Sequence, residues 1–306
     1  MSATLLIAQL LNGLQYGVLL FLLAAGLTLV FGIMSFVNLA HGSLYMLGAY
    51  AGAVAYEATG SFTLAVLASA GAALAVGLVL EVTIVSRLYR RDHLDHVLAT
   101  FGLVLFFNEL VRIVWGPQPM YVQVPDVLSG TVDVLGFSYP SYRFAIIAAG
   151  LLVAVGSWLL IHKTRVGMLI RAGAQNPQMV SALGVNIRLL NAMLFGLGAM
   201  LAGLAGAMAG PILSVQSGMG EPVLITTLVV IVIGGIGSVS GAFYASLIVG
   251  LVDTLGRAFL PIALRQVAER SIADAAGPAL ASMAVYLLMA LVLAWRPQGL
   301  FPAHRG

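Results

Sequence analysis

Long apolar runs, separated by short polar stretches, follow one another along most of the chain. The longer runs match the roughly 20 apolar residues that a helix needs to cross a lipid bilayer. They cover residues 8–31, 62–85, 97–115, 141–162, 189–210 and 279–295, and a run too short to cross alone covers residues 44–56. The pattern predicts an all-α integral membrane protein with about eight transmembrane helices, some of them broken by glycine or re-entrant.

A further apolar stretch at residues 223–252 is interrupted at its centre by Gly234-Gly-Ile-Gly-Ser-Val-Ser-Gly241. Glycine and serine are weak helix formers. Two short helices around a turn, entering and returning, are therefore favoured over one overlong kinked helix. The polar residues that follow predict a charged loop at residues 253–278.

Lysine and arginine collect in some of the polar stretches, which predicts the orientation of the chain because cytoplasmic loops of membrane proteins are rich in both. The cytoplasmic segments are then the loops at 86–96 and 163–187 and the C-terminal tail, with the cations Arg87, Arg90, Arg91, Lys163, Arg165, Arg171, Arg188, Arg296 and Arg305. The proline-rich loop at 116–140, which is compatible with a small hairpin, and the loop at 211–222 are expected outside. The arginines of 253–278 depart from this rule if 223–252 enters and returns.

The composition agrees with the pattern. The chain is 61% hydrophobic and 8% charged, against roughly 25% charged residues in soluble domains. We therefore treat residues 1–306 as a single transmembrane domain in contact with membrane lipid. The net charge of +3 is explained by the loops, so no nucleic-acid binding is expected. The apolar run near the N-terminus lacks the positive segment of a signal peptide, which favours a retained first span, with a bacterial inner membrane as the default location.

The sequence offers little support for an enzyme. It contains no Gly-x-x-x-x-Gly-Lys-Ser/Thr loop for ATP, and Lys163 is its only lysine. A nucleophile and base could be formed by Ser240 and His41, but Gly237-Ser-Val-Ser-Gly241 does not match the Gly-x-Ser-x-Gly turn of hydrolases. The chain also lacks cysteine, which excludes thiolate chemistry. No catalytic residue, cofactor or metal site is predicted.

A secondary transporter or channel for a small neutral solute is the alternative that the residues leave open. Ion-coupled carriers place ionisable groups inside the membrane. The candidates are Glu81, Glu109 and Asp253, and each has an arginine nearby along the sequence, at Arg87, Arg112 and Arg257. Pairing within a helix would explain these carboxylates without ion coupling.

The cytoplasmic stretch at 163–187 contains signals for a short helix at residues 177–183. Asn176 suits the N-cap, Pro177 the first helical position and Gly184 the position after the C-cap. Met179, Val180 and Leu183 would form one apolar face. Such a helix either lies in the lipid headgroups or inserts into a groove of a partner protein.

Four segments resemble the permeases of ABC importers for branched-chain amino acids, in particular the LivH-type subunit. The segments are Asn38-Leu-Ala-His-Gly42, the stretch from Arg171-Ala through Asn176 and Ala182 to Gly184-Val185, Gly234–Gly241, and Arg296-Pro-Gln-Gly-Leu-Phe301. They occur in the same order as in that family, and the resemblance extends over residues 8–302.

The resemblance implies an ABC importer permease fold and transport of branched-chain amino acids or similar small apolar amino acids or amides. It implies partners as well, namely two ATP-binding subunits, a second permease subunit and a periplasmic substrate-binding protein. Contact with the ATP-binding subunits would involve residues 172–184, and the residues expected to couple the two are Arg171, Asn176, Pro177, Met179, Val180, Ala182, Leu183 and Gly184.

The translocation pathway is expected at the two glycine-interrupted regions, because broken helices mark substrate sites in many transporters. Asn38 and His41 are costly in lipid unless they serve a purpose. The glycines of the second region are explained equally well by close helix packing. The candidate pathway residues are Asn38, His41, Gly42, Gly234, Gly235, Gly237, Ser238, Ser240 and Gly241.

Overall fold

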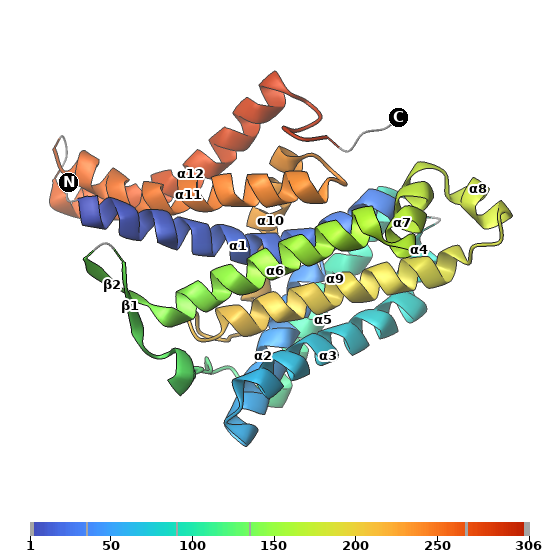
Figure 1. Ribbon diagram of the computed structural model, residues 1–306, viewed down its shortest axis with the longest axis horizontal. Helices are drawn as coiled ribbons and strands as arrows, with labels where there is room; N and C mark the ends of the chain where they lie inside the picture. The colour runs from blue at the N-terminus through green and yellow to red at the C-terminus, as the bar shows by residue number, and fades with distance from the viewer. Residues whose placement is uncertain (1–2, 35, 90, 135, 267–268, 303–306) are drawn as a thin grey trace.

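The structure, a computed structural model, describes residues 3–34, 36–89, 91–134, 136–266 and 269–302 (Figure 1). The cations Arg90 and Arg305, used above for orientation, lie outside these ranges. The helices and strands in chain order are α1 (Ala3–Met34), α2 (His41–Thr59), α3 (Phe62–Leu80), α4 (Ser86–Leu88), α5 (His93–Trp115), β1 (Thr131–Val134), β2 (Phe137–Pro140), α6 (Ser141–Lys163), α7 (Arg165–Gln175), α8 (Pro177–Ala182), α9 (Ile187–Ala209), α10 (Gly220–Gly234), α11 (Val239–Leu264) and α12 (Arg270–Trp295).

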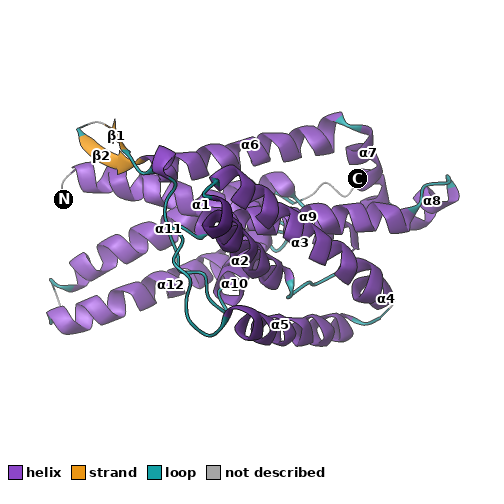
Figure 2. Cartoon of the chain, turned by 90° about the horizontal axis from the view of Figure 1, so that it is seen from below, coloured by secondary structure: helices purple, strands orange, loops and turns teal. Residues whose placement is uncertain are grey.

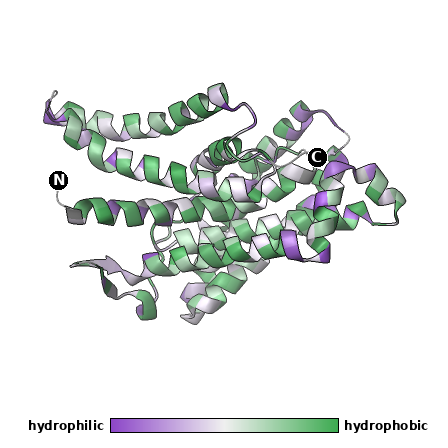
Figure 3. Cartoon of the chain, turned by 45° about the horizontal axis from the view of Figure 1, so that its top comes forward, coloured by the Kyte–Doolittle hydropathy of each residue, from purple (hydrophilic) through white to green (hydrophobic). Residues whose placement is uncertain are grey.

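The predicted all-α membrane fold is confirmed. Within the described residues, 7 helices are long and apolar enough to cross a membrane, and α10 is a shorter apolar helix. The long helices run roughly along one axis in Figures 1 and 2. Strands β1 and β2, the end of α11 and the start of α12 lie at one end, which we call the hairpin end. Helices α4, α7 and α8 lie at the other, the α8 end. Apolar residues colour the helix shafts in Figure 3, and polar residues gather near their ends.

Two predicted boundaries were wrong in the C-terminal part of the chain. The structure has no charged loop at 253–278, because α11 continues to Leu264 and α12 begins at Arg270. The charges are neutralised between helical positions: Arg257 Nε lies 2.8 Å from Asp253 Oδ2, and Arg265 Nη2 lies 2.6 Å from Asp274 Oδ1. Pairs of this kind let a helix extend past the apolar region, and hydropathy alone assigns those turns to a loop.

The prediction that the stretch 223–252 is divided between two helices is confirmed, since α10 ends at Gly234 and α11 begins at Val239. The hairpin expected within 116–140 is present as well, with β1 and β2 antiparallel from Thr131↔Pro140 to Val134↔Phe137. The Tyr139 hydroxyl attaches it to α1 by donating to Asn12 Oδ1 at 3.1 Å. Burial raises the pKa of Tyr139, and the nearby Arg143 offsets part of that rise.

Small residues bring the central helices together. A Cβ on Gly26 of α1 would lie 2.6 Å from the carbonyl oxygen of Gly198 of α9, and one on Gly198 would lie 3.0 Å from that of Gly26. The Ser69 hydroxyl of α3 donates to the Gly203 carbonyl of α9 at 2.6 Å, deep in the bundle. Close backbone approach and side-chain-to-backbone hydrogen bonds are the usual means of holding helices together in a bilayer.

The segment after α12 packs on the turn between α10 and α11. The amides of Leu300 and Phe301 donate to the carbonyls of Ile233 and Gly234, at 2.8 Å and 3.0 Å. Helix carbonyls at a C-terminus otherwise lack partners. Gly235 has φ +102°, and a Cβ there would lie 3.0 Å from the Phe301 carbonyl oxygen. Two of the segments that carry the family resemblance, 234–241 and 296–301, are therefore parts of one contact.

We expect Gly235→Leu to lower the stability of the purified protein by about 2 kcal/mol or more, because the side chain needs space that the tail occupies and a backbone with negative φ. Thermal unfolding in detergent measures this. The matched control is Gly116→Leu, since Gly116 also has positive φ, at +86°, but has nothing within 4 Å of its added Cβ. Equal melting temperatures for the two variants would show that backbone strain, and not contact with the tail, sets the cost.

Candidate translocation site and coupling helix

Two helices, α2 and α10, begin in the middle of the molecule, and we call them the inner helices. The His41 Nε2 at the start of α2 lies 3.3 Å from the carbonyl oxygen of Leu23, well inside α1. A Cβ on Gly42 would lie 2.6 Å from the carbonyl oxygen of Gly220, the first residue of α10, and a Cβ on Gly220 would overlap the Gly42 carbonyl. The two N-termini therefore meet with no room for a side chain.

From this meeting point the inner helices run in opposite directions, α2 toward the hairpin end and α10 toward the α8 end. At about 1.5 Å per residue, the 15 residues of α10 extend roughly 22 Å, less than the roughly 30 Å of a bilayer core. The segments α1–α2–α3 and α9–α10–α11 thus share one arrangement in inverted orientation. Inverted repeats with interrupted helices are typical of transporters, whose substrate sites lie near the interruption.

This arrangement corrects the sequence-based view of the second break. The segment that corresponds to residues 36–40 is 210–219, which precedes α10, and not 234–241, which follows it. The stretch 211–222 was expected to be an external loop. It instead leads the chain inward, with Val215 and Met219 buried and Val215 bridged to Met120 of the loop before the hairpin.

Polar side chains are buried where the chain enters α2. The exposed fraction of Asn38 is 2%, and both atoms of its side-chain amide lack a hydrogen-bond partner among the described residues. The His41 ring is fully buried, and its Nδ1 likewise has no such partner. Unpaired polar groups at this depth carry a free-energy cost, which supports the prediction that Asn38 and His41 serve transport.

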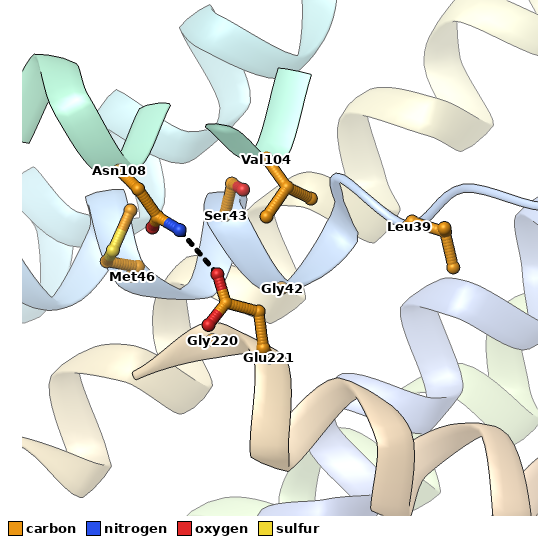
Figure 4. Close-up of a pocket in the computed structure, with 8 residues that line it drawn as sticks. All are labelled: Leu39, Gly42, Ser43, Met46, Val104, Asn108, Gly220 and Glu221. Atoms are coloured by element: carbon orange, nitrogen blue, oxygen red, sulfur yellow. Dashed lines mark hydrogen bonds between the residues drawn. The ribbon is translucent and has the colours of Figure 1, made fainter. Parts of the chain in front are cut away.

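A small cavity lies beside the N-termini of both inner helices (Figure 4). It is lined by Leu39, Gly42, Ser43, Met46, Val104, Asn108, Gly220 and Glu221. Its volume of about 10 Å³ has room for little more than one water molecule. A space of this size cannot hold an amino acid, so the structure shows this part of the protein closed. Of the predicted pathway residues, only Gly42 lines the cavity.

Asn108 of α5 organises the wall of this cavity. Its Oδ1 accepts from the Gly218 amide at 3.2 Å, and its backbone carbonyl accepts from the Ser217 hydroxyl at 3.0 Å. Its Nδ2 donates to Glu221 Oε1 of α10, the contact drawn in Figure 4. Sequence reasoning missed both Asn108 and Glu221. An amide inside an otherwise apolar run was the available signal for Asn108.

The second predicted pathway group, at 234–241, lies apart from this cavity and is tightly packed. A Cβ on Gly234 would lie 2.5 Å from the carbonyl oxygen of Gly241. Gly237 packs on Gly32 of α1, and the Ser238 hydroxyl caps α11 by accepting from the Gly241 amide at 3.0 Å. Ser240 is exposed and its hydroxyl lies 3.4 Å from that of Ser238, so it does not meet His41. This geometry favours the interpretation that the glycines of 234–241 serve close helix packing and do not line the pathway.

The predicted short helix at the α8 end is present as α8. The Asn176 side chain caps it by accepting from the Met179 amide at 2.9 Å, and Pro177 is its first residue. Gly184 has φ +88°, and the amides of Gly184 and Val185 donate to the carbonyls of Ser181 and Val180. These two hydrogen bonds form the glycine-dependent stop known as the Schellman motif.

The apolar residues of α8 do not all face the same way. Val180 is buried, with an exposed fraction of 6%, and fixes the helix to the bundle. Met179 and Leu183 are 61% and 77% exposed, and Ala182 beside them is exposed too. The sequence did not predict α7, which precedes α8, and on α7 Arg171 donates to the carbonyl of Ile161 at the end of α6. Of the predicted coupling residues, Met179, Ala182 and Leu183 therefore form the exposed surface of α8, which projects at the α8 end (Figure 2).

The candidate ion-coupling carboxylates have local partners. Glu109 pairs with Arg112 at 2.9 Å and Asp253 with Arg257 at 2.8 Å, as predicted. Glu81 is buried and accepts from the Tyr89 hydroxyl at 2.6 Å, whereas Arg87 donates to the Thr83 carbonyl instead. Burial, together with the Glu81 hydrogen bond, raises the pKa of Tyr89 above its usual range.

Comparison with known proteins agrees with this geometry. A family model described as "Branched-chain amino acid transport system / permease component" matches residues 9–293. The permease protein BraD of the high-affinity branched-chain amino acid transport system of Pseudomonas aeruginosa is 28% identical, over 95% of this chain and 94% of its own length. LivH of Escherichia coli strain K12 is 28% identical over 82% of this chain and 86% of its own. The ribose import permease RbsC of the same strain is 26% identical, over 76% and 72%. No solved structure matches significantly.

The bundle of apolar helices, with two inner helices that begin beside a small cavity, defines a multi-pass membrane transport protein. The match over residues 9–293 shows that the chain belongs to the permease components of branched-chain amino acid transport systems. The predicted family is thereby confirmed. Three of the four segments that carried the resemblance lie within the matched residues, and 296–301 lies beyond them.

Proposed function

We propose that the chain is one permease subunit of an ABC importer in a bacterial inner membrane. The observation that carries this proposal is the exposed apolar surface of α8, on a chain of the permease family. Met179 and Leu183 present large apolar groups on a helix that is rigidly capped at both ends. A groove on an ATP-binding subunit would cover them. ATP hydrolysis then belongs to two such subunits and not to this chain.

The distribution of charge supports an orientation with the α8 end in the cytoplasm. The cations of that end, on α4, α6, α7 and α9, form no ion pair with an acid among the described residues. At the hairpin end Arg112, Arg257 and Arg265 are each paired with a carboxylate. The cytoplasmic side is marked by its number of lysines and arginines, whether or not acids lie nearby. Among the described residues, the α8 end has Arg87, Arg91, Lys163, Arg165, Arg171, Arg188 and Arg296, and the hairpin end has fewer, namely Arg112, Arg143, Arg257, Arg265 and Arg270. The N-terminus of α1 then lies outside, with β1, β2, the end of α11 and the start of α12.

Transport would proceed by alternating access between two states of the bundle. ATP binding would draw the two ATP-binding subunits together, and α8 would pass that movement to α7 and α9. The inner helices pack closely at their N-termini, where Gly42 meets Gly220, and a separation at this point would open the cavity. A partner can shift such an equilibrium only through contacts that differ between the states, and the α8 surface can provide them.

The solute is proposed to be a branched-chain amino acid or a similar small apolar amino acid or amide. BraD and LivH carry that description. The similarity to a ribose permease shows that related chains serve unlike solutes. A periplasmic binding protein would deliver the solute to the hairpin end, and a second permease subunit would complete the pathway.

Gentle purification of the tagged chain from its native membrane tests the proposal. Recovery of ATP-binding subunits together with a second permease is the expected result. Recovery of this chain alone in several mild detergents would favour a secondary transporter or channel. ATP-dependent uptake of L-leucine by the reconstituted complex, with its binding protein, then tests the solute.

A further inference from the structure

Glu221 differs from Glu81, Glu109 and Asp253, the three carboxylates considered above for ion coupling. Glu109 and Asp253 are each balanced by an arginine, and Glu81 is held by the Tyr89 hydroxyl. Glu221 forms no ion pair in the described part of the chain, and its described partner is the neutral side chain of Asn108. Its carboxylate therefore lies beside the central cavity without a cation.

The hydrogen bonds of Glu221 leave half of the carboxylate free. Oε1 accepts from Asn108 Nδ2, and no described donor is bound to Oε2. A negative charge in the first turn of α10 is favoured by the helix dipole. The helix dipole would stabilise this charge equally well without a neighbouring cavity and without an asparagine from another helix, so it does not explain why both are present. The position of Asn108, fixed by Ser217 and Gly218, holds one carboxylate oxygen in place beside the cavity.

The remaining groups of the cavity complement the other parts of an amino acid. The first turn of α2, with Gly42 and Ser43, presents the positive end of a helix, which favours a carboxylate. Leu39, Met46 and Val104 offer an apolar wall. An ammonium acceptor, a carboxylate site and an apolar wall thus surround one space between α2, α5 and α10 (Figure 4).

We propose that Glu221 binds the ammonium group of the transported amino acid and that the cavity between the inner helices enlarges into its binding site. The proposal rests on the proposed function, since it names the group that recognises the solute of that transporter. Glu221 selects for solutes with a positive amine. The first turn of α2 receives the solute carboxylate, and the closed cavity is the form of the site without solute.

The variant Glu221→Gln separates ligand binding from a structural role. The glutamine carbonyl can still accept from Asn108, so the link between α5 and α10 is kept while the charge is lost. A hydrogen bond to a charged partner is worth about 1.5–3 kcal/mol. ATP-driven uptake of L-leucine by the complete reconstituted importer is therefore expected to fall about tenfold or more, with unchanged subunit recovery. The control is Asp92→Asn, at an exposed acid just before α5 at the α8 end, away from the cavity and from residues 171–184. Wild-type uptake by Glu221→Gln would overturn the proposal.

A second measurement does not depend on leucine uptake. The chain has no cysteine, so Ser43→Cys introduces a unique thiol at the cavity wall. The labelling preference is the rate with trimethylammonioethyl methanethiosulfonate divided by the rate with sulfonatoethyl methanethiosulfonate, measured during ATP turnover of the complex. The first turn of α2 lowers this ratio and the Glu221 carboxylate raises it. Adding Glu221→Gln is expected to reduce that preference by at least about threefold, since a unit charge acts strongly at this range. Excess L-leucine should slow labelling while Glu221 is present.

The two measurements distinguish failure of the proposal from failure of the proposed function. If the wild-type complex does not take up L-leucine but the labelling preference depends on Glu221, the solute assignment is wrong and the cation site stands. If uptake occurs but Glu221→Gln changes neither uptake nor labelling preference, the carboxylate has only a structural role. No labelling of Ser43→Cys under turnover would mean that the cavity does not open, which also overturns the proposal.

Discussion

An importer complex that carries Ala182→Glu in this chain is expected to assemble in the membrane and to lose at least about 90% of its ATP-driven solute uptake. Ala182 is exposed on α8 beside the exposed Met179 and Leu183. A partner that covers this surface would have to bury a carboxylate without a counter-charge, which costs several kcal/mol. The stability of the folded chain itself is expected to be unchanged, because position 182 is exposed and the new side chain points away from the bundle.

Co-purification of the ATP-binding subunits measures whether the complex assembles, and uptake into proteoliposomes measures the loss of transport. The matched control is Ser86→Glu, which places the same charge at an exposed position of α4, also at the α8 end but outside residues 171–184. If α8 lies in the lipid headgroups and contacts no partner, both variants will transport normally. Such a result would remove the coupling role from all of residues 171–184.

The second large effect is expected at the meeting point of the inner helices. Gly220→Val should prevent recovery of folded protein or lower its stability by more than about 3 kcal/mol, at the upper end of overpacking effects. A Cβ on Gly220 overlaps the Gly42 carbonyl, and the opposing atoms are backbone that a change of rotamer cannot move. The inner helices would be pushed apart and the neighbouring cavity distorted.

Size-exclusion profiles and thermal unfolding in detergent test this expectation. Gly71→Val is the control, because Gly71 lies inside α3 with nothing within 4 Å of an added Cβ. The control also accounts for the change in intrinsic helix propensity. A Gly220→Val protein as stable as the control would mean that the N-termini of α2 and α10 do not touch.

The sequence predicted those features that depend on neighbouring residues. The apolar runs predicted most spans, and the capping residues Asn176 and Gly184 predicted α8 within a residue of its ends. The prediction failed where helices continue through charged residues that neutralise one another, as with Asp253 and Arg257. A hydropathy profile counts such residues as polar and cannot show that they are paired.

The candidate site was predicted only in part, because its groups come from distant parts of the chain. Asn108 and Glu221 are separated by 113 positions, and neither has a local pattern that points to the other. Asn38 and His41 were found because unpaired polar residues are conspicuous in an apolar context. The inward course of 210–219 was missed because its residues resemble those of a surface loop, and only the fold shows that Gly220 meets Gly42.

The contact between the last described residues and the α10–α11 turn has a consequence for biosynthesis. Leu300 and Phe301 complete the hydrogen bonding of the Ile233 and Gly234 carbonyls, yet the ribosome adds them more than 60 residues later. The carbonyls of Ile233 and Gly234 at the end of α10 therefore lack these two hydrogen bonds until α11 and α12 have left the insertion machinery. The final conformation of this helix end is reached after synthesis of the bundle is over, and a fusion partner joined directly after Phe301 would interfere with that last step of folding.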